Sequence, residues 1–231
     1  DVTPEEVKTL AERHYAPLKA NPDLGARARP QEPDHNAARR IVFEDPRVAQ
    51  PYVSRSFLAP ERDSGNQKTA AALMLGAALL GDGQTAFMTQ KLQFEEQSAV
   101  YASAFYRGTS LDDTRFTIVV VPAAGVSLSE AEANMDRVLA EFMEAPIDLA
   151  HLARIKRSMR ADRIYAKDNV QGLANRYGRA LTAGLSVRDI LEWPDVVESV
   201  TEQDIKAALA EVFNEKASVT GWLTSGQEAA Q

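Results

Sequence analysis

The sequence predicts an α+β fold, a two-layer sandwich in which helices pack on one face of a mostly antiparallel or mixed sheet of about five to six strands. One observation behind this is the order of the elements, which after a separate first helix read β-β-α-α-β-β-α-α-α-α-α-β. Paired strands with helices bunched between them differ from the strict alternation of a parallel α/β sheet. The other is a composition of 45% hydrophobic and 26% charged residues, which is ordinary for a globular chain.

Residues 1–18 predict one helix, which a capping box from Thr3 to Glu6 opens and Pro17 ends. Residues 19–37 contain three prolines and one glycine with almost no large apolar side chains, a composition typical of a linker. A lone helix of this length cannot build a core of its own. It therefore either docks on the following domain or is the tail of a preceding domain that is absent from this sequence.

β-Branched and aromatic runs, some of them alternating with period two, predict the strands. The predicted strands are Arg39–Glu44, Gln50–Leu58, Ser98–Tyr106, Arg115–Val121 and Ser218–Leu223. Asp45-Pro46 is expected to form a turn between the first two strands, and Gly108–Asp113 is expected to join the third and fourth as a hairpin.

Helical spacing and end signals predict the remaining elements. The predicted helices are 66–80, Thr85–Phe94, Ser127–Glu144, Pro146–Lys167, 169–183, Ser186–Glu192 and Thr201–Phe213. Capping boxes begin at Ser127 and Thr201, and Pro194 is expected to stop the helix that starts at Ser186. The final residues are small and polar, which predicts a disordered tail at 225–231.

Charge and residue counts exclude several functions. A net charge of −7, from 26 basic and 33 acidic residues, argues against a nucleic-acid or anionic-membrane partner. The chain has no cysteine, so disulfides, thiolate catalysis and cysteine-held metals are excluded. No apolar run approaches the ~18 residues that span a bilayer. The three histidines, His14, His35 and His151, are isolated in the sequence and are expected to be packing or surface residues.

Three polar features are candidates for chemistry, and each has a simpler interpretation. No strand precedes Gly81-Asp82-Gly83, which favours a turn between helices over a phosphate-binding loop. Glu95-Glu96 could serve acid–base catalysis or a metal, but neighbouring residues on a helix point ~100° apart. A basic stripe fits either an anion or a nucleic-acid backbone or, more simply, a solvated face paired with carboxylates. Its residues are Lys156, Arg160, Arg163 and Lys167.

Several segments, taken in order, resemble one known family. They are 1–15, Arg39–Pro51, Ser54–Pro60, Leu79–Thr85, Leu92–Tyr106, Ile164–Leu173 and Ser218–Leu223. They resemble the C-terminal (second) domain of insulinase/pitrilysin-type zinc peptidases, an inverzincin family, and in particular its bacterial members similar to the mitochondrial processing peptidase. The resemblance covers residues 1–223. It implies that 1–18 is the last helix of a preceding zinc-binding domain, 19–37 a linker, 38–224 the second peptidase-family domain and 225–231 a disordered tail.

The family's zinc motif, His-x-x-Glu-His, occurs nowhere in this sequence. The resemblance therefore implies that this chain has no catalytic and no metal-binding residues, and that zinc lies in the first domain of a parent metallopeptidase. This chain would be non-catalytic on its own and would enclose peptide substrates. Its implied partners are its own N-terminal zinc domain and a second peptidase-family subunit or a homodimer. The alternative is an inactive peptidase-like assembly module that uses the same fold for protein–protein contacts.

Tyr101 is the candidate substrate-binding residue. Family members use an Arg and a Tyr, seven residues apart, to hold the substrate carbonyl, and Tyr101 resembles that Tyr. Phe94 stands at the position of the Arg. The Arg–Tyr pair is therefore incomplete. The second domain of the family's zinc-bearing half normally lacks this pair, so the resemblance implies that this chain belongs to that half. Tyr101 is then either a substrate contact or a sheet residue packed under the helices. For a bacterial parent the resemblance favours the periplasm, with the cytoplasm as the alternative.

Overall fold

The computed structural model describes residues 2–25, 33 and 35–226. Its contacts divide the chain into two units, Asp1–Asp34 and His35–Gln231. The predicted linker and the predicted disordered tail fall in part on 26–32, 34 and 227–231, which lie outside the described residues.

The described part of the first unit is built around the helix α1 (Pro4–Tyr15). The predicted capping box is present, because the Glu6 N–H donates to the Thr3 hydroxyl at 3.2 Å and the Thr3 N–H donates to the Glu6 carboxylate at 2.7 Å. No described residue of α1 is buried, and Val7 and Leu10 are 51% and 50% exposed. Caps and local side-chain contacts, rather than a core, therefore support this helix.

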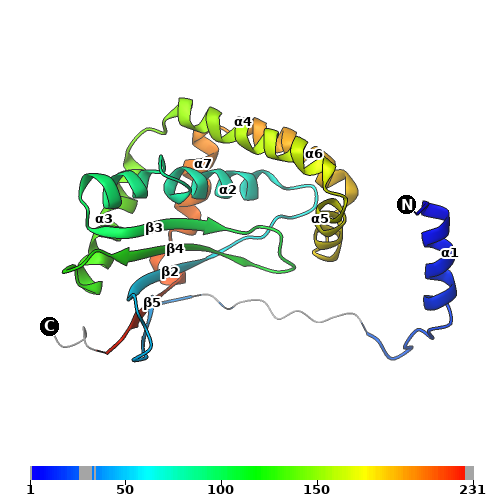
Figure 1. Ribbon diagram of the computed structural model, residues 1–231, viewed down its shortest axis with the longest axis horizontal. Coiled ribbons are helices and arrows are strands. Elements are labelled where there is room, and N and C mark those ends of the chain that lie inside the picture. Colours follow the sequence, from blue (N-terminus) through cyan, green and yellow to red (C-terminus); the bar gives the residue numbers. More distant parts are fainter. Residues whose placement is uncertain (1, 26–32, 34, 227–231) are drawn as a thin grey trace. The chain divides into compact units, whose positions relative to one another are not determined.

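The second unit is built on a sheet with the strand order β1-β5-β2-β4-β3 (Figure 1). The strands are β1 (Arg39–Glu44), β2 (Tyr52–Ala59), β3 (Ala99–Tyr106), β4 (Thr114–Pro122) and β5 (Ser218–Thr224). The predicted hairpin of β3 and β4 is confirmed. The strands β1 and β2 do not pair with each other, because β5 lies between them, parallel to β1 and antiparallel to β2. The sheet is therefore mixed, as predicted.

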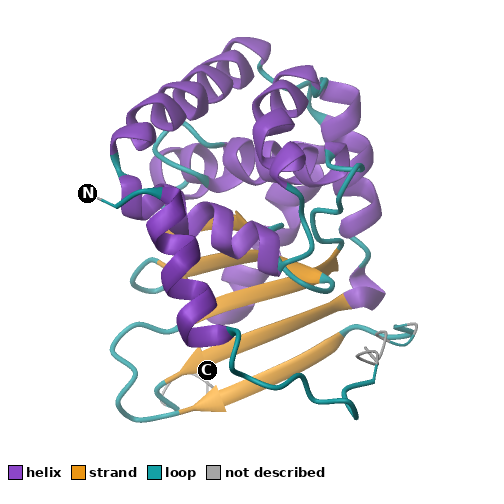
Figure 2. Ribbon diagram, turned by 90° about the vertical axis from the view of Figure 1, so that its right-hand side faces the viewer, coloured by secondary structure: helices purple, strands orange, loops and turns teal. Residues whose placement is uncertain are grey.

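Helices pack on one face of this sheet, which confirms the predicted two-layer arrangement (Figure 2). The longer helices are α2 (Lys68–Gly81), α3 (Leu128–Glu144), α4 (Leu149–Tyr165), α5 (Val170–Thr182), α6 (Val187–Ser199) and α7 (Glu202–Val212). The shorter ones are the π-helix η1 (Thr89–Glu95) and the 3-10 turns η2 (Ala166–Asp168) and η3 (Glu215–Ala217). The predicted capping boxes at Ser127 and Thr201 open α3 and α7.

The prediction that Pro194 stops the helix from Ser186 is wrong, because α6 continues through Pro194 to Ser199. A proline has no N–H, so the carbonyl four residues earlier loses its helical partner. That carbonyl belongs to Ile190, and the Arg163 guanidinium of α4 donates to it at 2.8 Å. A side chain from a neighbouring helix thus satisfies the carbonyl that Pro194 leaves free, and the helix continues.

Helix α2 is the centre of the core, and eleven of its fourteen residues are buried. A Cβ added to Gly81 would lie 2.2 Å from the Ala104 nitrogen of β3, and one added to Gly76 would lie 3.0 Å from Leu209 of α7. These glycines let α2 approach the sheet on one side and α7 on the other more closely than larger residues allow. Gly81 ends α2, and Gly83 adopts a positive φ of 84° in the turn that follows, so Gly81-Asp82-Gly83 is a turn between helices, as the simpler interpretation predicts.

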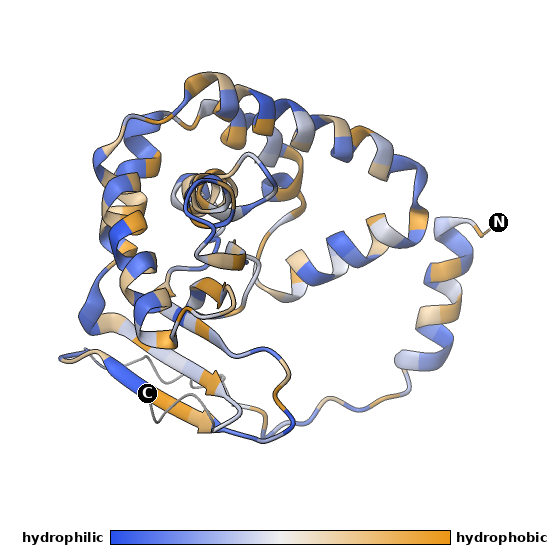
Figure 3. Ribbon diagram, turned by 60° about the vertical axis from the view of Figure 1, so that its left-hand side comes forward, coloured by the Kyte–Doolittle hydropathy of each residue, from blue (hydrophilic) through white to orange (hydrophobic). Residues whose placement is uncertain are grey.

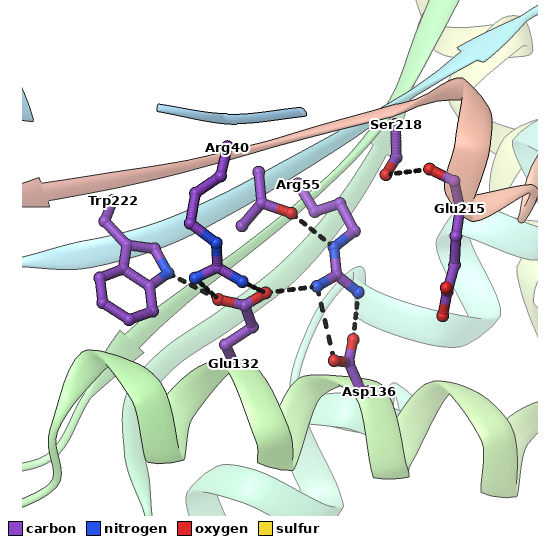
Figure 4. A network of polar contacts seen from close by, with 8 residues as sticks. Arg40, Arg55, Glu132, Asp136, Glu215, Ser218 and Trp222 are labelled. Carbon is purple, nitrogen blue, oxygen red and sulfur yellow. Dashed lines mark hydrogen bonds and ion pairs between the residues drawn. The ribbon is translucent and has the colours of Figure 1, made fainter. Parts of the chain in front are cut away.

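A buried polar network fastens α3 to three neighbouring strands (Figure 4). Glu132 of α3 accepts hydrogen bonds from Arg40 of β1 at 2.7 Å, Arg55 of β2 at 2.8 Å and the Trp222 indole of β5 at 2.7 Å. Arg55 also pairs with Asp136, one turn along α3. Every buried side-chain nitrogen and oxygen of the described residues has a partner. The charges at the sheet–helix boundary are therefore fully compensated.

Candidate interaction surface

The described residues contain no group of three His, Asp or Glu side chains that could hold a metal ion. His151 of α4 shares a hydrogen bond of 3.1 Å with the Thr85 hydroxyl. Burial lowers the pKa of His151, and the nearby Arg154 lowers it further. A largely buried imidazole held by a hydroxyl agrees with the prediction of a packing residue. His14 is exposed on α1 in the first unit, and His35 lies just before β1.

The acidic pair Glu95-Glu96 does not form a site. Glu95 pairs with Lys91 at 2.8 Å, whereas Glu96 pairs with Arg137 of α3 at 2.6 Å. The two carboxylates serve different partners, as their separation around the helix predicts.

Most side chains of the basic stripe on α4 already have hydrogen-bond or ion-pair partners within the protein. Arg160 pairs with Glu198 at 2.6 Å, which fits a face paired with carboxylates. The Lys156 ammonium instead donates to the Glu198 and Val200 carbonyls at 2.8 and 2.7 Å, and Arg163 donates to Ile190. The stripe therefore joins α4 to α6.

Tyr101 lies on the face of the sheet that the helices leave open. It is 44% exposed and stands opposite Val121 of β4, whose neighbour Val120 points into the core. The alternative prediction, that Tyr101 packs under the helices, is wrong. A bulge between Ala99 and Tyr101 is the cause, because an extra residue in the strand reverses the alternation of its two faces.

Tyr101 is the last member of an apolar row that crosses the open face. The strand registers place Phe43 of β1 beside Leu223 of β5, and Leu223 beside Tyr52 of β2. In the antiparallel pair of β2 and β4, Val53 lies opposite Val120, so the preceding residue Tyr52 lies beside Val121. Val121 in turn lies opposite Tyr101 of β3. We call Phe43, Leu223, Tyr52, Val121 and Tyr101 the apolar row.

The apolar row is accessible and lies at one end of the open face. Phe43 is 59% exposed, and the edge strand that carries it changes from hydrophilic to hydrophobic along its length (Figure 3). The next two rows are mixed: serines occupy β2, with the Ser56 hydroxyl 3.0 Å from that of Thr117, while Ile41 and Phe105 are exposed on the two edge strands. A half-exposed strip with tyrosines and a phenylalanine has the composition of a protein-binding surface rather than of a solvated sheet face.

Comparison with known proteins assigns the chain to a family. The model of the peptidase M16 inactive domain matches residues 1–159, more than half of the chain. The chain belongs to the peptidase M16 family. Within that family this domain is the inactive, non-catalytic half of zinc-protease-like proteins.

Solved structures share the fold of this M16 domain. A protease from Helicobacter pylori matches with a TM-score of 0.83 and 22% identity, over 97% of this chain and 53% of that one. An M16 inactive domain from Pseudomonas fluorescens matches with a TM-score of 0.74 and 18% identity, over 97% and 52%. The periplasmic protease PqqL from Escherichia coli matches with a TM-score of 0.80 and 14% identity, over 100% and 26%. No curated protein matches the sequence.

The M16 domain spans about half the length of the first two of these structures and a quarter of the third. The family assignment agrees with the resemblance of the sequence to the second domain of such peptidases, and with zinc belonging to another domain. None of the helices in the described part of the chain is long and apolar enough to cross a membrane.

The apolar row could not be predicted from the sequence. Its five members are far apart along the chain and meet only through the registers of four strand pairs. The family resemblance at Tyr101 did identify one end of the row. It left undecided whether the Tyr101 side chain contacts substrate or packs under the helices.

Proposed function

We propose that this chain is the non-catalytic second domain of a zinc metalloendopeptidase, and that its apolar row contacts peptide substrate inside the enclosure formed with a partner half. The proposed organisation is the last helix of the zinc domain at 1–18, a linker at 19–37, the second domain at 38–224 and a tail at 225–231. Zinc and catalysis belong to the preceding domain. The parent protein is proposed to be periplasmic, as one similar structure is by name.

The observation that carries this proposal is the open face with its apolar row. A helix layer stabilises the other face, so the side chains of the row are not needed to fill the core. Tyrosine suits contact with varied peptides, because its ring packs on apolar side chains while its hydroxyl bonds backbone groups. Tyr101 is proposed as a substrate contact on these grounds.

A single fluorescent label tests the role of the row, because the chain has no cysteine of its own. Tyr101→Cys places the label at the end of the row, and Ser158→Cys places it on an exposed position of α4. Unfolded peptides are titrated into both labelled proteins. The label at position 101 is expected to respond and saturate, and the label at 158 is expected to stay constant. Equal responses at both positions, or none at either, would contradict the proposal.

Catalysis is tested separately. The chain alone is expected to show no zinc-dependent peptide hydrolysis, and measurable hydrolysis would refute the non-catalytic role. The alternative function, an assembly module, makes the same prediction for the chain alone. The coding region upstream of Asp1 separates the two, because the peptidase requires a His-x-x-Glu-His helix there and the assembly module does not.

A further inference from the structure

A second surface, on the helical side of the molecule, has the features of a ligand site. One cavity of about 800 Å³ lies between the loop that joins β3 to β4, helix α5 and Trp193 of α6. A second cavity of about 520 Å³ lies between α4, α5 and α6. Both are lined by Arg62, Met74, Arg176 and Trp193, so the two cavities adjoin each other. We call the two cavities together the arginine groove.

The arginine groove is strongly positive although the chain carries a net charge of −7. Among the described residues, four arginines and no acidic residue line the first cavity. The second cavity adds three more cations, Lys156, Arg160 and Arg163, which already contact α6 or the residue after it, and two acids. The arginines of the first cavity are Arg62, Arg107, Arg176 and Arg179. A concave surface lined by one sign of charge concentrates ligands of the opposite sign.

Arg62 forms a fixed wall of the groove. It is only 9% exposed, its Nε donates to the Gln67 side chain at 2.7 Å, and its Nη2 donates to the Asp189 carbonyl at 2.8 Å. Its guanidinium lies over the Trp193 ring at 3.8 Å. Burial lowers the pKa of Arg62 to about 10, so it remains charged at neutral pH.

The other arginines of the first cavity are available for a ligand. Among the described residues, no acceptor is hydrogen-bonded to the side chains of Arg107, Arg176 or Arg179, and no carboxylate lies within 4.0 Å of them. Arg176 lies close enough to Arg163 that its charge, together with burial, lowers the pKa of Arg163. Like charges held together repel, and a bound anion would remove that repulsion.

The apolar lining narrows the class of anion. Met74, Tyr106 and Trp193 line the first cavity beside the arginines, and the Tyr106 hydroxyl is turned away to donate to the Pro60 carbonyl at 2.7 Å. A phosphate or a nucleic-acid backbone has no apolar part to place on this floor. Planar guanidiniums match carboxylates in pairs of parallel hydrogen bonds. An acidic side chain next to an apolar one satisfies both parts of the groove.

We propose that the arginine groove binds an extended peptide segment in which carboxylate side chains alternate with apolar ones. Arg176 and Arg179, three residues apart on one side of α5, hold the carboxylates, and Trp193 packs against the apolar side chains. This site lies among the helices and uses none of the apolar row, so it does not depend on the proposed function of the open face.

Fluorescence anisotropy of a labelled peptide of alternating Glu and Leu tests the proposal. The double variant Arg176→Gln/Arg179→Gln is expected to raise the Kd about tenfold or more, because it removes two charge-assisted contacts. The matched control Arg154→Gln/Arg157→Gln removes two charges from exposed positions of α4 outside the groove, and is expected to leave the Kd within about twofold. Thermal unfolding of both variants checks that each is folded.

Four further probes test the ligand class. Replacing Glu by Gln or Leu by Ser in the peptide is expected to weaken binding, since the groove requires both features. Inorganic phosphate and a single-stranded oligonucleotide are expected to compete poorly. Equal losses in the two double variants, equal binding of the Gln peptide, or tighter binding of the oligonucleotide would overturn the proposal.

Discussion

The two faces of the sheet differ most clearly at two adjacent valines of β4. Val120 points toward the helices and is 1% exposed, whereas Val121 points to the open face and is half-buried beside Tyr101. The residue type and the strand are the same, so the difference lies only in what covers each side chain. The covered face supplies stability, and the open face keeps apolar side chains available for a partner.

The same contrast applies to charge. On α3, Glu132 faces the sheet and is held by two arginines and an indole, whereas Glu141 pairs with Arg137 where both side chains are about 40% exposed (39% and 41%). Removal of the buried Glu132 carboxylate leaves a buried cation, Arg55, with one carboxylate partner fewer, while an exposed pair is well solvated either way.

The largest expected effect is that of Glu132→Ala. It leaves Arg55, which is about 10% exposed, with only Asp136 as a carboxylate partner, and breaking such a buried pair costs about 3–5 kcal/mol of unfolding free energy. Urea denaturation measures this. The matched variant Glu141→Ala, on the same helix, is expected to cost only about 0.5 kcal/mol. Similar losses in the two variants would show that the network is not needed for stability.

A second pair of variants compares the two faces directly. Val120→Ala is expected to lower the unfolding free energy by about 2 kcal/mol, because it removes buried methyl groups and leaves a cavity. Val121→Ala removes the same atoms from the open face and is expected to cost well under about 1 kcal/mol. The reverse order of the two values would mean that another part of the protein covers the open face in solution.

The smallest expected effect concerns pH. In the helix layer the Lys68 ammonium of α2, 2.8 Å away, together with Thr201, lowers the pKa of Asp204 to about 2 from an ordinary 3.8. A carboxylate whose pKa is lowered by folding stabilises the folded state above the unfolded pKa, and this contribution is lost as the pH falls from about 4 toward 2. Lys68→Ala is expected to make the melting temperature less dependent on pH in this window. An unchanged dependence would exclude this ion pair as a contributor.

Local features of the fold were predictable from the sequence, because they depend on residues close together. The capping boxes at Ser127 and Thr201 and the hairpin of β3 and β4 are of this kind. The length of α6 was not predictable, because Arg163 from another helix compensates Pro194. The face of Tyr101 was missed because a bulge reverses the alternation.

The candidate sites depend even more on distant residues. The basic stripe on α4 suggested an anion site, yet most of its members join α4 to α6. The unpaired cations that line the arginine groove come from α5 and from the loop between β3 and β4. The spacing of Arg176 and Arg179 on α5 could be found in the sequence, but only the tertiary structure brings them together with Arg62 and Arg107.

The place of β5 between β1 and β2 has a consequence for biosynthesis. Its pairing joins Arg39 to Val219, so β1 leaves the ribosome long before the strand that must hold it. During that interval the apolar residues Ile41, Val42 and Phe43 lack the strand that pairs with them in the folded protein, and exposed apolar segments of this kind are prone to associate with other nascent chains. Long-range strand pairing of this kind also slows folding. Completion of the sheet therefore waits for the synthesis of β5, and chaperone protection of β1 would matter most before that moment.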